Sequence, residues 1–260
     1  MKLIAYSVSI IILLNLILVI PVTGKPFKEL NEQARKAYEL GQYNEALTFW
    51  KEIYTSGNSD PDVMYNIGLC ESMLGNLPSA ILFFEKSIRH KPFDQEIKLA
   101  IRRERTKIEN AVIPVRPFFL LEWSKGLLAF LRPGTWALIG LFLLLISLLK
   151  WLTENRLVKY ERFYIPGKFW AYSIAGLIFV MISIFSYSAR YRLNEGIIFT
   201  SCELNQGPST QSPIVRLIQP GEKVKIIDEI SAWYKVNLLN LDEGWLKKEC
   251  LEIIDLHENS

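Results

Sequence analysis

The stretch LGQYNEALTFW, residues 40–50, has an echo in LGNLPSAILFF, residues 74–84. Three pairs of positions agree between the two stretches, each pair 34 residues apart: Gly41 and Gly75, Ala46 and Ala80, and Trp50 and Phe84. A glycine lets the chain reverse between two helices, and an alanine suits a place where helices approach closely. An aromatic ring one helical turn further on fills the space behind that contact. The pattern therefore predicts two successive helix–turn–helix units of the same length.

Thirty-four residues is the length of a tetratricopeptide repeat, and this part of the chain resembles that repeat class. The units fall at 27–60 and 61–94, and the amphipathic segment 95–110 predicts a helix that caps the open end. Two units and a cap fall short of the three or more repeats that a solenoid usually needs. We therefore expect self-association or another protein to complete the stack.

In repeats of this class the first helix of each unit lines a concave surface. We expect this surface to bind a peptide or helix of a partner protein. Its candidate contact residues are Asn31, Arg35, Tyr38, Tyr65, Asn66, Leu69, Met73, Leu99 and Arg103. The alternative is that each of them is an ordinary solvated or partly packed side chain. Only Asn66 matches the lysine, asparagine and arginine clamp with which some members hold a C-terminal carboxylate, so that ligand is not predicted.

Half of the 260 residues are hydrophobic, which indicates membrane segments. Residues 133–151 and 168–188 predict two transmembrane helices, joined by a cytoplasmic loop at 152–167. Cations are more frequent between the two apolar runs than outside them, which places the loop inside. Those between are Lys150, Arg156, Lys159, Arg162 and Lys168, and those outside are Lys125, Arg132, Arg190 and Arg192. The apolar and aromatic segment 111–132 is expected to link the repeats to the hairpin and to lie at the membrane interface.

Residues 1–24 predict a signal peptide, because Lys2 precedes an apolar run and Val22, Thr23 and Gly24 are small enough for a cleavage site. The alternative is an uncleaved signal anchor, since the apolar run is long enough to span a membrane. Both alternatives place the chain from Lys25 onward on the outer side of the cytoplasmic membrane.

Residues 195–256 form a third region, in which short β-prone runs alternate with glycine, proline, asparagine and aspartate. NQGPS at 205–209, WYKV at 233–236 and GWL at 244–246 follow the order and spacing of a bacterial Src-homology-3 (SH3)-type domain, which this region resembles. The resemblance implies a small all-β barrel. One departure is Asn205, where such domains commonly have arginine.

The barrel suggests a ligand site and a cross-link. Trp233, Tyr234 and Trp245 are candidates for an exposed aromatic shelf that binds a peptide or a glycan, although one or two of them are equally suited to closing the small core. In barrels of this type the segments of Cys202 and Cys250 lie near each other. The two cysteines are therefore either a disulfide, which an extracytoplasmic location permits, or two small buried residues.

The whole order of segments resembles one bacterial family. Exported repeats, PFFLLEW at 117–123, RPGTWAL at 132–138 entering a helical hairpin, and a C-terminal barrel are similar to the repeat-containing, BatE-like member of the Bacteroides aerotolerance (Bat) operon. The resemblance implies a scaffold in the cytoplasmic (inner) membrane that binds von Willebrand A-domain membrane proteins in a periplasmic complex and acts in aerotolerance or envelope stress. The alternative is a peptidoglycan-binding envelope protein or sensor that uses the barrel.

No enzyme is expected, because the sequence holds no nucleophile–base pair, paired carboxylates or phosphate-binding loop. Two histidines and three cysteines, without CxxC or HExxH, predict no metal site, and no cofactor is predicted. A net charge of +3 is too small to indicate a nucleic-acid partner. The sequence therefore predicts a multi-domain α + β protein with helical repeats, a two-helix transmembrane hairpin and a small all-β barrel.

Overall fold

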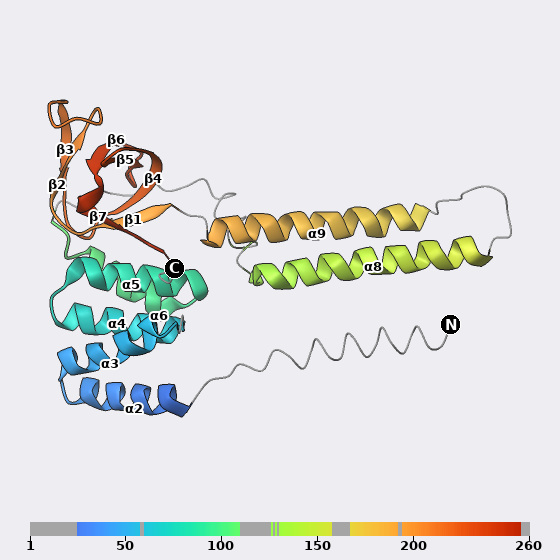
Figure 1. The fold of residues 1–260 in the computed structure, drawn as a ribbon, viewed down its shortest axis with the longest axis horizontal. Helices are drawn as coiled ribbons and strands as arrows, with labels where there is room; N and C mark the ends of the chain where they lie inside the picture. The colour runs from blue at the N-terminus through green and yellow to red at the C-terminus, as the bar shows by residue number, and fades with distance from the viewer. Residues whose placement is uncertain are drawn as a thin grey trace. The chain divides into compact units, whose positions relative to one another are not determined.

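A computed structural model describes residues 25–57, 60–109, 126, 128, 130–157, 167–191 and 194–255. The chain divides into two units, Met1–Asn58 and Ser59–Ser260, and Figure 1 labels their helices and strands. The predicted signal peptide and most of the predicted interfacial segment and cytoplasmic loop lie outside the described residues. Those three assignments stay predictions.

The first unit contains a helical hairpin made of α2 (Lys25–Glu39) and α3 (Tyr43–Thr55). Gly41 forms the turn with φ at +75°, a left-handed conformation that glycine adopts at little cost. Ala46 is fully buried where the helices pack. The glycine and the alanine of the repeated pattern thus hold the positions for which their small size was predicted.

Trp50 fills the space behind this contact. Its side chain is 2% exposed, and its indole Nε1 donates a hydrogen bond to Asn31 Oδ1 at 2.9 Å. The ring of Tyr38 packs against it at 5.9 Å between ring centroids. Two of the predicted partner-binding residues are therefore occupied in holding Trp50.

The second unit begins with a similar hairpin of α4 (Pro61–Met73) and α5 (Leu77–His90). Gly75 makes the turn with φ at +81°, and Ala80 is fully buried. The ring of Phe84 lies over Gly68, where a Cβ atom would come within 2.6 Å of two ring carbons. A glycine at this position is therefore a packing requirement.

Helix α6 (Gln95–Arg105) follows, capped by the Asp94 carboxylate, which accepts hydrogen bonds from the backbone N–H groups of Glu96 and Ile97. The helix ends at Arg105 instead of continuing to residue 110. The hydroxyl of Thr106 donates to the carbonyl of Arg103 and competes for the last turn. The chain then turns so that Ile108 becomes buried.

Helices α8 (Pro133–Leu157) and α9 (Gly167–Tyr191) are long and apolar enough to cross a membrane over Pro133–Thr153 and Phe169–Ser188. They lie antiparallel, since Ser183 near the end of α9 donates a hydrogen bond to the carbonyl of Pro133 at the start of α8. Their backbones approach closely at two glycines. A Cβ atom at Gly140 would lie 2.9 Å from the carbonyl oxygen of Gly176.

Seven strands form one antiparallel sheet in the C-terminal part of the described chain. In chain order they are β1 (Glu195–Ile198), β2 (Cys202–Asn205), β3 (Ile214–Ile218), β4 (Lys223–Ile230), β5 (Trp233–Asn237), β6 (Glu243–Lys247) and β7 (Leu251–Ile253), with the 3-10 helix η1 (Lys248–Cys250) before the last. Their order in the sheet is β3-β2-β6-β5-β4-β1-β7. Leu204, Val236 and Leu246 are fully buried in its core. Gly244 lets β6 approach β2, because a Cβ atom there would fall 2.5 Å from Leu204 Cγ.

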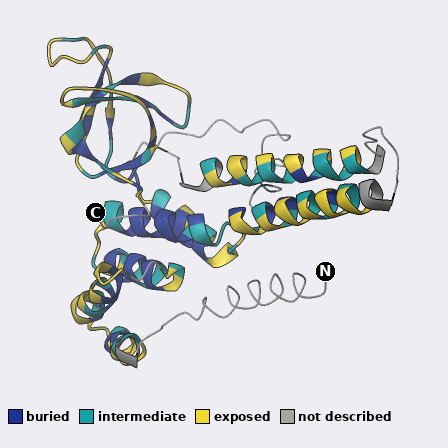
Figure 2. Cartoon of the chain, turned by 45° about the vertical axis from the view of Figure 1, so that its right-hand side comes forward, coloured by how far each residue is buried: buried dark blue, intermediate teal, exposed yellow. Residues whose placement is uncertain are grey.

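Helix α5 is buried along most of its length (Figure 2), and the barrel provides part of its cover. An apolar cluster joins the two: Ile81 and Leu82 of α5, Ile108 after α6, and Ile197 and Ile254 of the barrel. The left-handed turn at Gly221 fits against this cluster, since a Cβ atom there would lie 3.1 Å from Ile81 Cδ1. We expected another protein chain to complete the helical stack, but the chain's own barrel covers part of it.

Five alternating charges cross the same contact. Lys223 Nζ of β4 lies 2.9 Å from Glu85 Oε2 of α5 and 2.7 Å from Glu195 Oε2 of β1. Arg105 pairs with Glu85 at 2.8 Å, and Arg89 pairs with Glu195 at 3.1 Å. The guanidinium of Arg89 also donates to the carbonyl of Ile254. In this ion chain the buried Glu85 and the partly buried Glu195 thus each lie between two cations, which offsets the cost of removing the charges from water.

The ion chain keeps the Glu85 carboxylate and the Lys223 ammonium charged although burial favours their neutral forms. Burial by itself raises the pKa of the Glu85 carboxyl. The nearby charges of Lys223, Arg105 and Arg89 lower it by more than burial raises it, so the pKa lies below the usual range. Burial by itself lowers the pKa of Lys223, but Glu85 and Glu195 raise it, so its pKa lies above the usual range. A carboxyl with a lowered folded pKa stabilises the fold above its unfolded pKa, and this stabilisation is lost as the pH falls through the folded pKa.

We predict that Glu85→Gln destabilises the contact between α5 and β1 by about 3 kcal/mol, because it leaves buried cations without their carboxylate. Hydrogen–deuterium exchange of α5 and β1 in the full chain measures this loss. Below about pH 4.3 the difference between wild type and variant should shrink, because the wild-type carboxyl becomes protonated. The exposed Glu109→Gln variant is the matched control and should exchange like wild type. A difference that stays constant down to pH 2 would contradict the role of the Glu85 charge.

Candidate ligand pocket of the barrel

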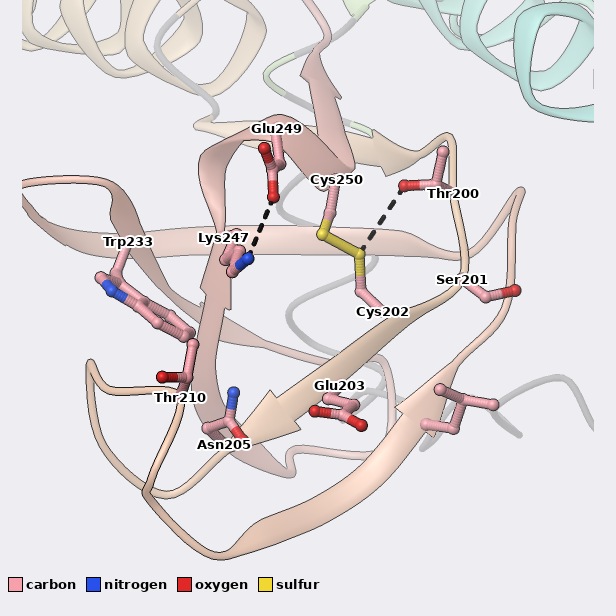
Figure 3. A pocket seen from close by; sticks show the side chains of 11 residues that line it. Thr200, Ser201, Cys202, Glu203, Asn205, Thr210, Trp233, Lys247, Glu249 and Cys250 are labelled. Carbon is pink, nitrogen blue, oxygen red and sulfur yellow. Dashed lines mark hydrogen bonds and ion pairs between the residues drawn. A yellow bond between two sulfur atoms is a disulfide. The ribbon is translucent and has the colours of Figure 1, made fainter.

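A pocket of about 600 Å³ opens on the barrel (Figure 3). It is lined by Thr200, Ser201, Cys202, Glu203, Asn205, Thr210, Leu217, Trp233, Lys247, Glu249 and Cys250. Its volume lies within the range of small-molecule and peptide pockets, and its lining combines an aromatic ring, hydroxyls and charges. This lining suits a ligand that has both apolar and polar groups.

Strand β2 forms one wall of the pocket because its side chains alternate between two faces. Cys202 and Leu204 point into the barrel core, whereas Glu203 and Asn205 belong to the opposite face. The register between β2 and β3 shifts between Leu204 and Asn205. Such irregularities bend a strand and re-aim its side chains, and they are frequent beside binding sites.

Asn205 is the most unusual side chain of this wall. It is 4% exposed, and its Oδ1 has no hydrogen-bond partner among the described residues. Its amide nitrogen points toward the pocket (Figure 3). An unpaired buried amide costs about 1–3 kcal/mol relative to a paired one. A ligand in the pocket would meet this amide through its nitrogen.

Of the three charged residues that line the pocket, two form an ion pair and the third does not. Lys247 Nζ pairs with Glu249 Oε1 at 3.2 Å, so these two charges compensate each other. Glu203 is exposed and makes no ion pair or side-chain hydrogen bond with any residue that the structure describes. The pocket therefore presents one uncompensated carboxylate.

The three aromatic residues of the predicted shelf do not lie together. Trp233 lines the pocket, directly across from Lys247 on β6. Trp245 lies on the same face, across from Lys235 on one side and Asn205 on the other. A shelf of two tryptophans is therefore compatible with the register of the strands.

Tyr234 lies on the other face of β5. It is paired with the fully buried Leu246 and packs against the barrel core. The ammonium of Lys248 covers its ring at 4.9 Å from the centroid. The alternation of side chains along a strand thus separates Tyr234 from the two tryptophans, and its part in a ligand shelf stays a prediction.

Cys202 and Cys250 form a disulfide with 6.3 Å between their Cα atoms. The bond ties β2 to the end of η1, and both cysteines line the pocket. It therefore joins the wall that carries Glu203 and Asn205 to the segment that carries Glu249. Of the two arrangements that the sequence left open, the structure contains the disulfide.

The predicted partner-binding residues of the first unit lie on α2. Arg35 is exposed and pairs with Glu32 at 3.5 Å and with Glu39 at 3.8 Å. Tyr38 packs on Trp50 and on Tyr43. Exposed ion pairs of this kind contribute little to stability, so Arg35 remains accessible to a ligand.

The predicted partner-binding residues of the second unit lie on α4 and α6. Tyr65 donates a hydrogen bond to Glu96 and, with Leu69, packs on the apolar cluster around Phe84. Asn66 is half-buried. The exposed members are Met73, Leu99 and Arg103. The structure thus divides the predicted set into packed residues and residues available to a partner.

Two further observations concern chemistry. The described residues contain no group of three or more histidine, cysteine, aspartate or glutamate side chains that would hold a metal ion. Cys70 is buried in α4, and burial together with the nearby charge of Glu71 raises the pKa of its thiol to about 12. Cys70 is therefore a packing residue.

Comparison with known proteins gives one match. Residues 204–252 match the family model described as Bacterial SH3 domain. The match runs from the pocket wall at β2 through β6 to β7, so it contains most residues of the pocket. No curated protein sequence matches the chain.

We predict that the double variant Cys202→Ala/Cys250→Ala loses about 3–4 kcal/mol of barrel stability, because the bond closes a loop between residues 48 positions apart. Unfolding of the full chain, followed through exchange of the core amides of β2 and β6, should become insensitive to reductant in the variant. Wild type should show the same loss only after reduction. Equal stability of oxidised wild type and variant would contradict this role.

Proposed function

We propose that this protein is a non-enzymatic envelope protein, held in the cytoplasmic (inner) membrane by α8 and α9, whose barrel binds peptidoglycan outside the cytoplasm. The observation that carries the proposal is the pocket with its unpaired Asn205, which lies in the segment matching the bacterial SH3 domain. Such domains commonly bind peptidoglycan or proteins.

The hairpin supports this arrangement. Because α8 and α9 are antiparallel, the start of α8 and the end of α9 lie at the same end of the pair. If both helices span the membrane, the helical part before Pro133 and the barrel after Tyr191 are on one side. The cations between the two apolar runs favour the outer side for both. Gly140 and Gly176, together with the 2.8 Å hydrogen bond between the hydroxyls of Ser147 and Ser173, hold the pair together in an apolar solvent.

We predict that the full chain in mild detergent sediments with purified peptidoglycan sacculi, and that Trp233→Ala reduces the bound fraction at limiting protein by about tenfold, because the ring forms a wall of the pocket. Trp245→Ala should give a smaller loss, because Trp245 lies beside the pocket. Tyr234→Phe is the control and should bind like wild type, because Tyr234 faces the core. Absence of wild-type protein from the pellet would refute peptidoglycan binding.

A second function rests on the helices. Leu99 of α6 is 56% exposed and Met73 of α4 is 53% exposed, so both are available to a partner protein. Tetratricopeptide repeats are scaffolds for such contacts. With the resemblance to the BatE-like family, these residues support a role as a scaffold for von Willebrand A-domain membrane proteins in an aerotolerance or envelope-stress complex.

We predict that a von Willebrand A-domain membrane protein of the same cell co-purifies with the chain in gentle detergent, and that Leu99→Glu abolishes this because it places a charge on the apolar surface. The matched control is Leu40→Glu, which alters an exposed leucine at the end of α2. Equal recovery with both variants would exclude Leu99 from the contact, and no recovery with wild type would exclude the scaffold role.

A further inference from the structure

We infer that the barrel pocket recognises a short peptide that carries a free primary ammonium group, with Glu203 as its counter-ion and Asn205 as the hydrogen-bonding partner of a peptide group. This inference rests on the proposed function and states which chemical group of the wall the pocket reads. Three observations carry it: the buried amide of Asn205, the uncompensated carboxylate of Glu203, and the apolar wall of Trp233 and Leu217.

The first observation is the state of Asn205. The nitrogen of a primary amide donates hydrogen bonds, so the carbonyl of a peptide group is a partner for the end that faces the pocket. Asn205 is 4% exposed, its Oδ1 is buried without a partner among the described residues, and its amide nitrogen points toward the pocket (Figure 3). A buried amide oxygen without a partner is rare, because buried polar groups in folded proteins are nearly always paired.

The second observation is the charge of Glu203. Glu203 and Asn205 are two residues apart on β2, and both line the pocket. A ligand that lies along this strand meets a carboxylate and then an amide. The charges of Lys247 and Glu249 cancel, so Glu203 leaves the pocket lining with one net negative charge. Charge complementarity therefore favours an ammonium group.

The third observation is the wall formed by Trp233 and Leu217, which lie on strands β5 and β3 and both line the pocket. An aromatic ring and an aliphatic side chain suit the methylene or methyl groups of amino-acid side chains. A neutral glycan would also stack on Trp233, but it would leave Glu203 without a charged partner. The pocket volume of about 600 Å³ is enough for a few residues of a peptide.

The test uses the full chain in detergent and two probes, the peptide acetyl-Ala-Lys-Ala-amide and the same peptide with its lysine side chain acetylated. Calorimetry should show that acetylation weakens binding by about tenfold or more, because it removes a charge-assisted hydrogen bond to a carboxylate. Glu203→Gln should weaken binding of the free-amine peptide by the same factor and leave the acetylated peptide unaffected. The control Glu243→Gln removes a carboxylate of β6 outside the pocket and should change neither affinity.

The amide is tested with a matched pair of asparagines. Asn205→Leu should weaken both peptides about tenfold, because both carry peptide groups. Asn237 also has an unpaired buried Oδ1, but it lies on β5 outside the pocket, so Asn237→Leu should leave both affinities unchanged. Retention of the Cys202–Cys250 disulfide and of wild-type amide exchange shows that each variant is folded.

Sacculi distinguish this inference from the proposed function. Chemical acetylation of the free amines in sacculi should release the wild-type chain into the supernatant. If native and acetylated sacculi retain the chain equally, and the two peptides bind equally or not at all, the ammonium inference is overturned while peptidoglycan binding stands. If the free-amine peptide is preferred but sacculi do not retain the chain, the ammonium belongs to a protein, and the proposed function is the part that fails.

Discussion

The buried ion chain between α5 and the barrel is the contact on which the second unit depends. Glu85 and Glu195 alternate with Arg105, Lys223 and Arg89 along it. Cations from two different elements flank each carboxylate, so separating α5 from the barrel would break the Glu85–Lys223 and Glu195–Arg89 pairs. The apolar cluster around Ile81 and Ile197 supplies affinity, and the ion chain specifies one orientation.

This contact also decides which side of the barrel is available to a ligand. The barrel meets the helices through β1, the start of β4 and the residue after β7, where Glu195, Lys223 and Ile254 lie. The pocket is built from β2, β3, β5, β6 and η1. Helix contact and ligand pocket therefore use different strands, and a binding module can be joined to the helical part without loss of its site.

Several features were predictable because they depend on local geometry. Gly41 and Gly75 have positive φ, as a reversal between two helices requires, and Ala46 and Ala80 are fully buried. The separation of Tyr234 from the two tryptophans was equally open to prediction, because residues adjacent in a strand face opposite sides. Asn205 was noticed only as a departure from a common arginine. Its importance depends on the absence of a partner for its amide, which no pattern of residue types can reveal.

The amino-acid sequence by itself determined the helical hairpins, the two apolar helices and the barrel strands, because spacing of small, apolar and turn-forming residues acts over a few positions along the chain. Only the tertiary structure decided that α5 is covered by the barrel, that Glu85 meets Lys223, and that Glu203, Asn205 and Trp233 border one pocket. Glu85 and Lys223, for example, are 138 residues apart in sequence. Their meeting depends on how whole elements pack, and long-range packing leaves no periodic signal in the sequence.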